Sequence, residues 1–198
     1  MPAPVTLTPG SAYQLLRPLH YNLRVQPLEA TPVNAVAATG SVGTSGSNPA
    51  NNNTITIGST VYTFKTTLTP ADGEVLIGSA ADDTALNLAH AINATGGTPG
   101  TDYQVAAAHP SVSAATSISS NRFTVTARTR GAAGNSIALA KSGTNVSVNG
   151  KTTLEGGVDG TVGSKWEHAI DSSYLYIAVA DNTVADRNWR RIALGSAF

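Results

Sequence analysis

Short segments that alternate apolar and polar residues, with glycine, asparagine and serine between them, constrain the fold of this chain most. The clearest are 54–57 and 60–66, which have a period of two and are separated by Gly58 and Ser59. Such alternation is typical of a strand with one buried face, and a two-residue connection that begins with glycine is typical of a tight hairpin. Further strands are predicted at 74–78, 103–107, 122–128 and 136–140. The chain is therefore expected to be mainly β.

One segment has the period of an amphipathic helix, and it is predicted at about 80–95. Ser79 with Asp82 three residues later resembles a capping box, and Gly96 supplies a stop. Asp82 and Asp83 fit the first helical turn, where the helix dipole favours anions, better than they fit a catalytic pair. The apolar face consists of Ala81, Ala85, Leu88, Ala89 and Ile92.

Composition divides the chain into four parts. Residues 1–38 hold six of the ten prolines and predict an extended arm with one short strand at 21–25, lying either on this chain's own domain or on a neighbouring subunit. Residues 39–53 are rich in Gly, Ser and Asn, which predicts a flexible loop. Residues 54–157 predict a β-rich core domain with one helix, and residues 164–198 a three-stranded meander. The predicted fold class is α+β, mainly β, with an antiparallel or mixed sheet or sandwich.

Charge and cysteine content exclude several classes of protein. Charged residues make up 12% of the chain, 12 basic against 12 acidic, whereas soluble domains average about 25%. Without clustered Lys and Arg we expect no nucleic-acid or membrane partner, and near-zero net charge favours association. The absence of Cys excludes thiolate metal sites and cysteine nucleophiles. No signal peptide or apolar run of roughly 18 residues is seen, so we expect a soluble protein made in the cytoplasm.

The titratable residues form no catalytic or metal-binding pattern. No two of the four histidines have ligand spacing. His90 is expected on the helix as a surface or partly buried residue, and His109 in a turn. The segments 171–173 and 181–183 are read as turns from their Asp, Ser, Asn and Thr content. We expect no enzyme activity, no metal and no cofactor.

Aromatic and arginine side chains gather near the C-terminus, and three interpretations remain open. They form the core of the meander, a subunit interface, or a platform for a sugar or a base. Together with apolar residues of the arm they make up the candidate interface: Tyr13, Leu15, Leu16, Tyr21, Leu23, Val25, Trp166, Tyr174, Tyr176, Trp189, Arg190 and Arg191.

Two stretches resemble virion proteins of tailed bacteriophages. The first is the order of 55–65, 75–78, 84–94 and 123–137, with its Thr-Ala-Arg and Gly-Ala-Ala-Gly-Asn segments, which is similar to a module of some contractile-tail sheath proteins. The second is 171–194, which is similar to a segment of other phage structural proteins. The resemblance implies a structural role with no catalytic residues.

The chain is too short for the multidomain plan of a sheath protein and lacks the repeats of a fibre shaft. The resemblance therefore implies a capsid decoration (cement) protein on the virion surface, made in the host bacterial cytoplasm. Its expected partners are the major capsid protein and further copies of itself, with a trimer favoured. The alternatives are a tail component (tube, adaptor or fibre base) and a host-surface carbohydrate-binding module.

Overall fold

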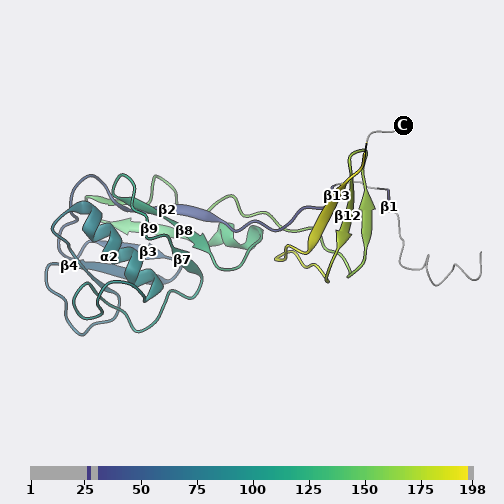
Figure 1. Cartoon of the computed structure of the whole chain (residues 1–198). Helices are drawn as coiled ribbons and strands as arrows, with labels where there is room; N and C mark the ends of the chain where they lie inside the picture. The colour runs from purple at the N-terminus through teal and green to yellow at the C-terminus, as the bar shows by residue number, and fades with distance from the viewer. Residues whose placement is uncertain (1–25, 28–30, 196–198) are drawn as a thin grey trace, which may run out of the picture. The chain divides into compact units, whose positions relative to one another are not determined.

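The computed structural model describes residues 26–27 and 31–195, and it divides the chain into two compact units (Figure 1). The terminal unit comprises Met1–Asn34 and Gly160–Phe198, and the inserted unit comprises Ala35–Asp159. The chain thus runs from the terminal unit through the whole inserted unit and back again. The strand predicted at 21–25 and the six candidate interface residues of the arm lie outside the described residues.

Two sheets form the inserted unit. One has the strand order β10-β2-β8-β7 and is antiparallel; the other has the order β6-β5-β4-β3-β9 and is mixed, because β4 and β5 are parallel. A 3₁₀ helix, Ala132–Ser136, precedes β9. The strands are β2 Thr39–Thr44, β3 Thr54–Ile57, β4 Thr60–Lys65, β5 Glu74–Leu76, β6 Tyr103–Gln104, β7 Val112–Ala114, β8 Arg122–Ala127, β9 Leu139–Ser142 and β10 Val146–Ser147.

The β3–β4 hairpin confirms the alternation read from the sequence. Ile57 pairs with Thr60 across the turn, and Gly58 has a φ of 58°, a conformation that glycine adopts without steric cost. The apolar residues of both strands are buried except Val61, which is exposed, and the threonines between them are half-buried. Threonine suits this outer position because its branched side chain fits the pleat.

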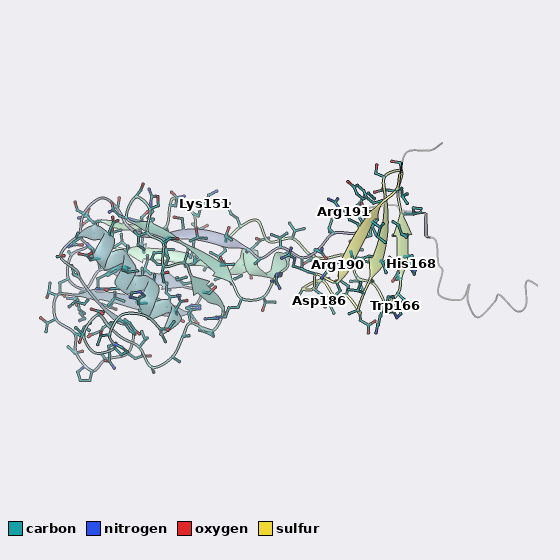
Figure 2. All side chains as sticks on the ribbon, in the orientation of Figure 1. Lys151, Trp166, His168, Asp186, Arg190 and Arg191 are labelled. Atoms are coloured by element: carbon teal, nitrogen blue, oxygen red, sulfur yellow. The ribbon has the colours of Figure 1, made fainter. Side chains whose placement is uncertain are left out.

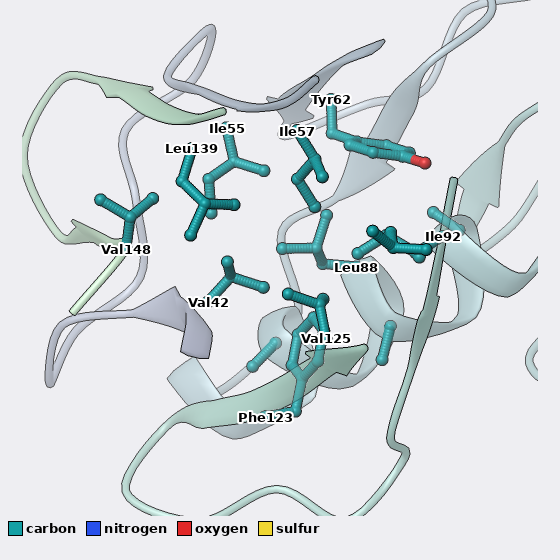
Figure 3. Packing of buried hydrophobic residues seen from close by; sticks show 14 of the residues in the cluster. Val42, Ile55, Ile57, Tyr62, Leu88, Ile92, Phe123, Val125, Leu139 and Val148 are labelled. Carbon is teal, nitrogen blue, oxygen red and sulfur yellow. The ribbon is translucent and has the colours of Figure 1, made fainter. Parts of the chain in front are cut away.

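Helix α2, Ala81–Asn93, confirms the predicted helix and contacts strands of both sheets. Asp83 caps its start by accepting a hydrogen bond from the backbone N–H of Ala80 at 3.0 Å. Leu88 and Ile92 enter a core to which both sheets contribute (Figure 3). The inserted unit is therefore a two-sheet sandwich closed by one helix.

The sequence prediction was wrong about residues 39–44 and about where the core domain begins. Residues 39–44 form β2, which lies between β8 and β10 and buries Val42, instead of a flexible loop. Position 40 requires glycine because a Cβ there would lie 2.5 Å from Leu154 Cδ2. The glycine therefore allows Leu154 to pack closely on the backbone of β2. Ala35 and Ala38 are also buried, so the unit begins at 35 and ends at 159, in place of the predicted 54–157 and the predicted arm end at 38.

In the terminal unit, β11 (His168–Ile170), β12 (Tyr174–Ala178) and β13 (Trp189–Ala193) form the predicted antiparallel meander. The structure adds β1 (Gln26–Pro27), which pairs with β11 in parallel. The fold class is thus α+β, mainly β. In the described part of the chain no helix has the length and apolar character needed to span a membrane.

Candidate interaction surface

Strand register assigns the aromatic and arginine side chains of the meander to two faces. Residues that pair directly across antiparallel strands point to the same side of the sheet. Because Tyr176 pairs with Ala169 and with Arg191, and Ala178 pairs with Trp189, one side forms an inner face. Its members are Ala169, Tyr174, Tyr176, Ala178, Trp189, Arg191 and Ala193; the outer face consists of His168, Ile170, Leu175, Ile177, Arg190 and Ile192.

Trp189 and Tyr176 belong to the core of the terminal unit. Each is 5% exposed, and they pack with Ala169 and Ala178. The indole N–H of Trp189 donates to the carbonyl of Thr161 at 2.7 Å, and the Tyr176 hydroxyl donates to Asp171 at 2.8 Å. Of the three interpretations of the aromatic residues, the core therefore applies to this pair.

Asp171 ties the β11–β12 turn to the inner face. Its Oδ1 accepts the backbone N–H groups of Ser173 and Tyr174, each at 2.7 Å, and the Arg191 guanidinium lies 4.4 Å above the Tyr174 ring. The bond from Ser173 first, then those from Tyr176 and Tyr174 and the Arg191 charge, hold the pKa of Asp171 below its usual value. Burial, together with this carboxylate, raises the pKa of Tyr176. Asp171 is thus a charged structural residue of the turn.

A cavity of about 570 Å³ lies between the segment Thr31–Asn34 and the inner face. Arg190 and Arg191 line it together with Tyr176 and Trp189. Asn34 Nδ2 donates to the carbonyl of Trp189 at 3.3 Å, and among the described residues its buried Oδ1 has no hydrogen-bond partner. The cavity thus combines two cationic side chains with apolar walls, which suits a polar or acidic group of a partner.

Among the described residues of this unit, Trp166 is the exposed aromatic residue (Figure 2), and its backbone conformation is unusual. It is 54% exposed, and its φ is 68°, a left-handed value that costs a bulky residue about 1–2 kcal/mol. Ala178 bonds both Trp166 N–H at 2.7 Å and the Glu167 carbonyl at 2.9 Å, so two residues oppose one in a β-bulge. The bulge holds Trp166 at the surface, where its ring lies 5.3 Å from the Lys165 ammonium.

Exposed large apolar side chains concentrate in the terminal unit. The longer inserted unit exposes three: Val36, Val61 and Val158. Among its described residues the terminal unit exposes eight: Val33, Val162, Trp166, Ile170, Val179, Val184, Ile192 and Leu194. Concentrated exposed apolar surface marks protein interaction sites, so the terminal unit is the candidate interaction module.

A second cavity, of about 380 Å³, lies in the inserted unit beside Tyr62, Asp72 and His109. His109 Nε2 lies 3.0 Å from the Ile57 carbonyl, and Nδ1 accepts the backbone N–H groups of Ser111 and Val112. Burial first, and then the Arg128 charge, lower the pKa of His109, whereas burial and the Asp72 charge raise that of Tyr62. Both are neutral near pH 7, and His109 fastens three backbone groups, so its role is structural.

Two structural residues were missed by sequence reasoning. His109 is 3% exposed instead of lying in an open turn, and Asn182 is buried with bonds to backbone atoms of Thr161, Thr183 and Asn188. No local pattern distinguishes either from a surface turn residue. Within residues 26–27 and 31–195, no three His, Asp or Glu side chains gather as a metal site would require.

No family model, curated protein or solved structure matches this chain.

Proposed function

We propose that this protein is a structural subunit that attaches to a larger protein assembly through its terminal unit, and that the assembly is the head of a tailed bacteriophage. The observation that supports attachment is the exposed Trp166, which a strained bulge of the terminal unit holds at the surface. Strain of this kind persists where the surroundings or a function require it. Tryptophan and arginine are also the side chains most often found at the centre of protein interfaces.

The edge of the meander offers a second means of attachment. β13 is one of the two edge strands of this sheet among those described. The Trp189 carbonyl on its free side accepts from Asn34 and Arg190, so a strand of a neighbouring subunit would pair with the remainder of that edge. Arg190 and Arg191 on this strand discourage indiscriminate pairing, because charged side chains oppose edge-to-edge aggregation. A neighbour that supplies carboxylates beside them would be selected.

The resemblance of 55–65 and 171–194 to phage virion proteins supports the choice of assembly. On that basis we propose a capsid decoration protein whose partners are the major capsid protein and further copies of itself. Attachment would add association free energy to the shell without any chemical step.

Co-sedimentation of the purified chain with capsid shells that lack it tests attachment. Trp166→Gly removes the exposed ring at a backbone position that suits glycine, so the fold is retained while shell binding falls by about tenfold or more. The matched control is Val61→Ser, which removes an exposed apolar side chain from the inserted unit and leaves binding unchanged. Equal binding by the wild type and Trp166→Gly would contradict the proposed role of the terminal unit.

Immunogold electron microscopy of particles released from cells that carry this gene tests the assembly. Labelled heads support a decoration protein, whereas labelled tails support a tail component. Absence of label from every particle, together with Trp166-dependent binding on a glycan array, would replace the proposal with a carbohydrate-binding module.

A further inference from the structure

The outer face of the meander is an apolar sheet surface that no described segment covers. Leu175 and Ile177 are half-buried on it, and Ile170 and Ile192 are exposed. Val179 and Leu194 continue the same alternation, since Val179 N–H donates to Asn188 and Leu194 N–H donates to Ser173. His168 Nδ1, from the same face, is buried without a hydrogen-bond partner among the described residues. A sheet that is apolar on both sides requires cover on both.

The inner face is covered by residues 31–34 of the same chain, which follow the edge strand β1. Val33 accepts the Thr161 N–H, and Asn34 bonds Trp189, which places residues 31–34 against the inner side. Upstream, Gln26 pairs with Ala169 and Pro27 with Ile170. The 25 residues before β1 therefore leave the described structure at the edge of the same sheet, beside β11.

We propose that residues 13–25 of the same chain cover the outer face of the meander, with the uncharged segment Tyr13-Gln14-Leu15-Leu16 lying over Leu175, Ile177 and Ile192. The sequence supports this assignment, because residues 13–25 hold the apolar side chains of the segment and the chain enters the described sheet directly after them, at β1. These apolar residues are Tyr13, Leu15, Leu16, Tyr21, Leu23 and Val25.

Reach and charge fit the same segment. The distance from β11 to β13 is two strand spacings, about 10 Å, whereas the nine residues from Val25 to Leu16 extend to about 30 Å. Arg190, the cation on this face, donates to the carbonyls of Arg187 and Trp189. Its side chain also lines the cavity beside Thr31–Asn34, so the charge is held at the β13 edge beside these carbonyls and away from the middle of the outer face. Because the segment is tethered at the sheet edge, its effective concentration is far higher than that of any separate partner.

A single thiol in this cysteine-free chain tests the proposal. Ile192→Cys places the thiol on the outer face, and its maleimide labelling rate is measured in the full-length native protein. Adding Leu15→Asp and Leu16→Asp, which are outside the described fold, should speed labelling about tenfold or more because the cover is lost. Val61→Cys is the control, since Val61 is 47% exposed against 56% for Ile192 and its thiol should label equally in both backgrounds.

Several outcomes would overturn the proposal. Equal labelling at residue 192 with and without the two aspartates would show that the segment does not cover the face. Protection that fades on dilution would assign the cover to a second copy, and protection that requires added shells would assign it to another protein. Unchanged tryptophan fluorescence, which comes from the terminal unit alone, confirms that the unit remains folded in each variant. The measurement uses the isolated chain, so its result does not depend on whether the protein binds capsids.

Discussion

Buried polar side chains in this protein bond mainly to the backbone and seldom to opposite charges. Among the described residues there are two ion pairs, Lys65 with Glu74 at 3.5 Å and Lys151 with Glu155 at 2.9 Å. Glu74 also accepts the backbone N–H of Thr69 at 2.6 Å, and that bond is the main cause of its lowered pKa. Few charged residues, 12% of the chain, are therefore enough to satisfy the buried polar side chains, because main-chain groups act as their hydrogen-bond partners.

Stability of the inserted unit should decrease as pH falls from 7 to 5, through His109. Its pKa in the folded state lies below the ordinary 6.5, so below that pH the unfolded chain binds more protons. The contribution is full above 6.5 and is lost as pH falls toward the folded value. Urea unfolding followed by far-UV circular dichroism measures the effect. His109→Gln should lower the unfolding free energy by about 1–3 kcal/mol at pH 7 and weaken its dependence on pH between 7 and 5. The same pH dependence in the variant and the wild type would contradict this role of His109.

Trp166→Gly should leave the terminal unit as stable as the wild type or raise its unfolding free energy by up to about 1 kcal/mol, because glycine adopts a φ of 68° freely. Near-UV circular dichroism of the remaining tryptophan during urea unfolding measures this. Trp166→Ala is the comparison: it removes the ring but retains the strain, and should be less stable than the glycine variant. A clear loss of stability in Trp166→Gly would mean that the ring supports the fold.

At the scale of elements, α2 holds together the two sheets of the inserted unit. It contacts β2, β7 and β8 of one sheet and β5 and β6 of the other. Its buried alanines, Ala85, Ala89 and Ala91, allow close approach on both sides. The pattern of small residues was visible in the sequence, whereas the two-sided packing depends on strands that are distant along the chain.

Leu88→Ala should destabilise the inserted unit by about 3 kcal/mol, because it leaves a cavity where the helix meets both sheets. Leu86→Ala, on the same helix but half-buried, should cost about 1 kcal/mol or less and serves as the matched control. Thermal or urea unfolding of the two variants provides the comparison. Equal losses would show that α2 does not pack as described.

The meander should lose stability in acid through Asp171. Its folded pKa lies below the ordinary 3.8, so its contribution is full above that value and is lost as pH falls through the folded value. Both tryptophans lie in the terminal unit, so their fluorescence follows this unit alone. Asp171→Asn should reduce the pH dependence of the unfolding free energy in the range from about pH 5 to about pH 2. If the variant kept the pH dependence of the wild type, the acid sensitivity would belong to another carboxylate.

At the scale of the whole molecule, one unit is inserted into the chain of the other. Val36 and Val158, near the ends of the inserted unit, exchange backbone hydrogen bonds of 2.9 and 3.1 Å. All residues of its hydrophobic core lie between Ala38 and Leu154. The terminal unit, by contrast, requires both of its chain segments, because residues 31–34 cover the meander and β1 extends it.

Residues 35–159 expressed alone should therefore fold and unfold cooperatively, as measured by circular dichroism and amide hydrogen exchange. Residues 160–198 alone should not form a stable meander, because three strands with four core residues and no cover are marginal. A folded 160–198 fragment, or an unfolded 35–159 fragment, would contradict this division of the chain.

Local periodicity determined the elements whose neighbours are close in the chain: the β3–β4 hairpin, α2 and the meander follow from spacing that the sequence displays directly. Tertiary structure decided the features that depend on distant residues. Gly40 reads as part of a loop until Leu154 packs against it, and His109 reads as a turn residue until Ile57 accepts its bond. The pairing of β1 with β11, across more than 140 residues, is of the same kind. Such contacts leave no local periodic signal, because hydrophobic burial and hydrogen bonding act between residues that only the complete fold brings together.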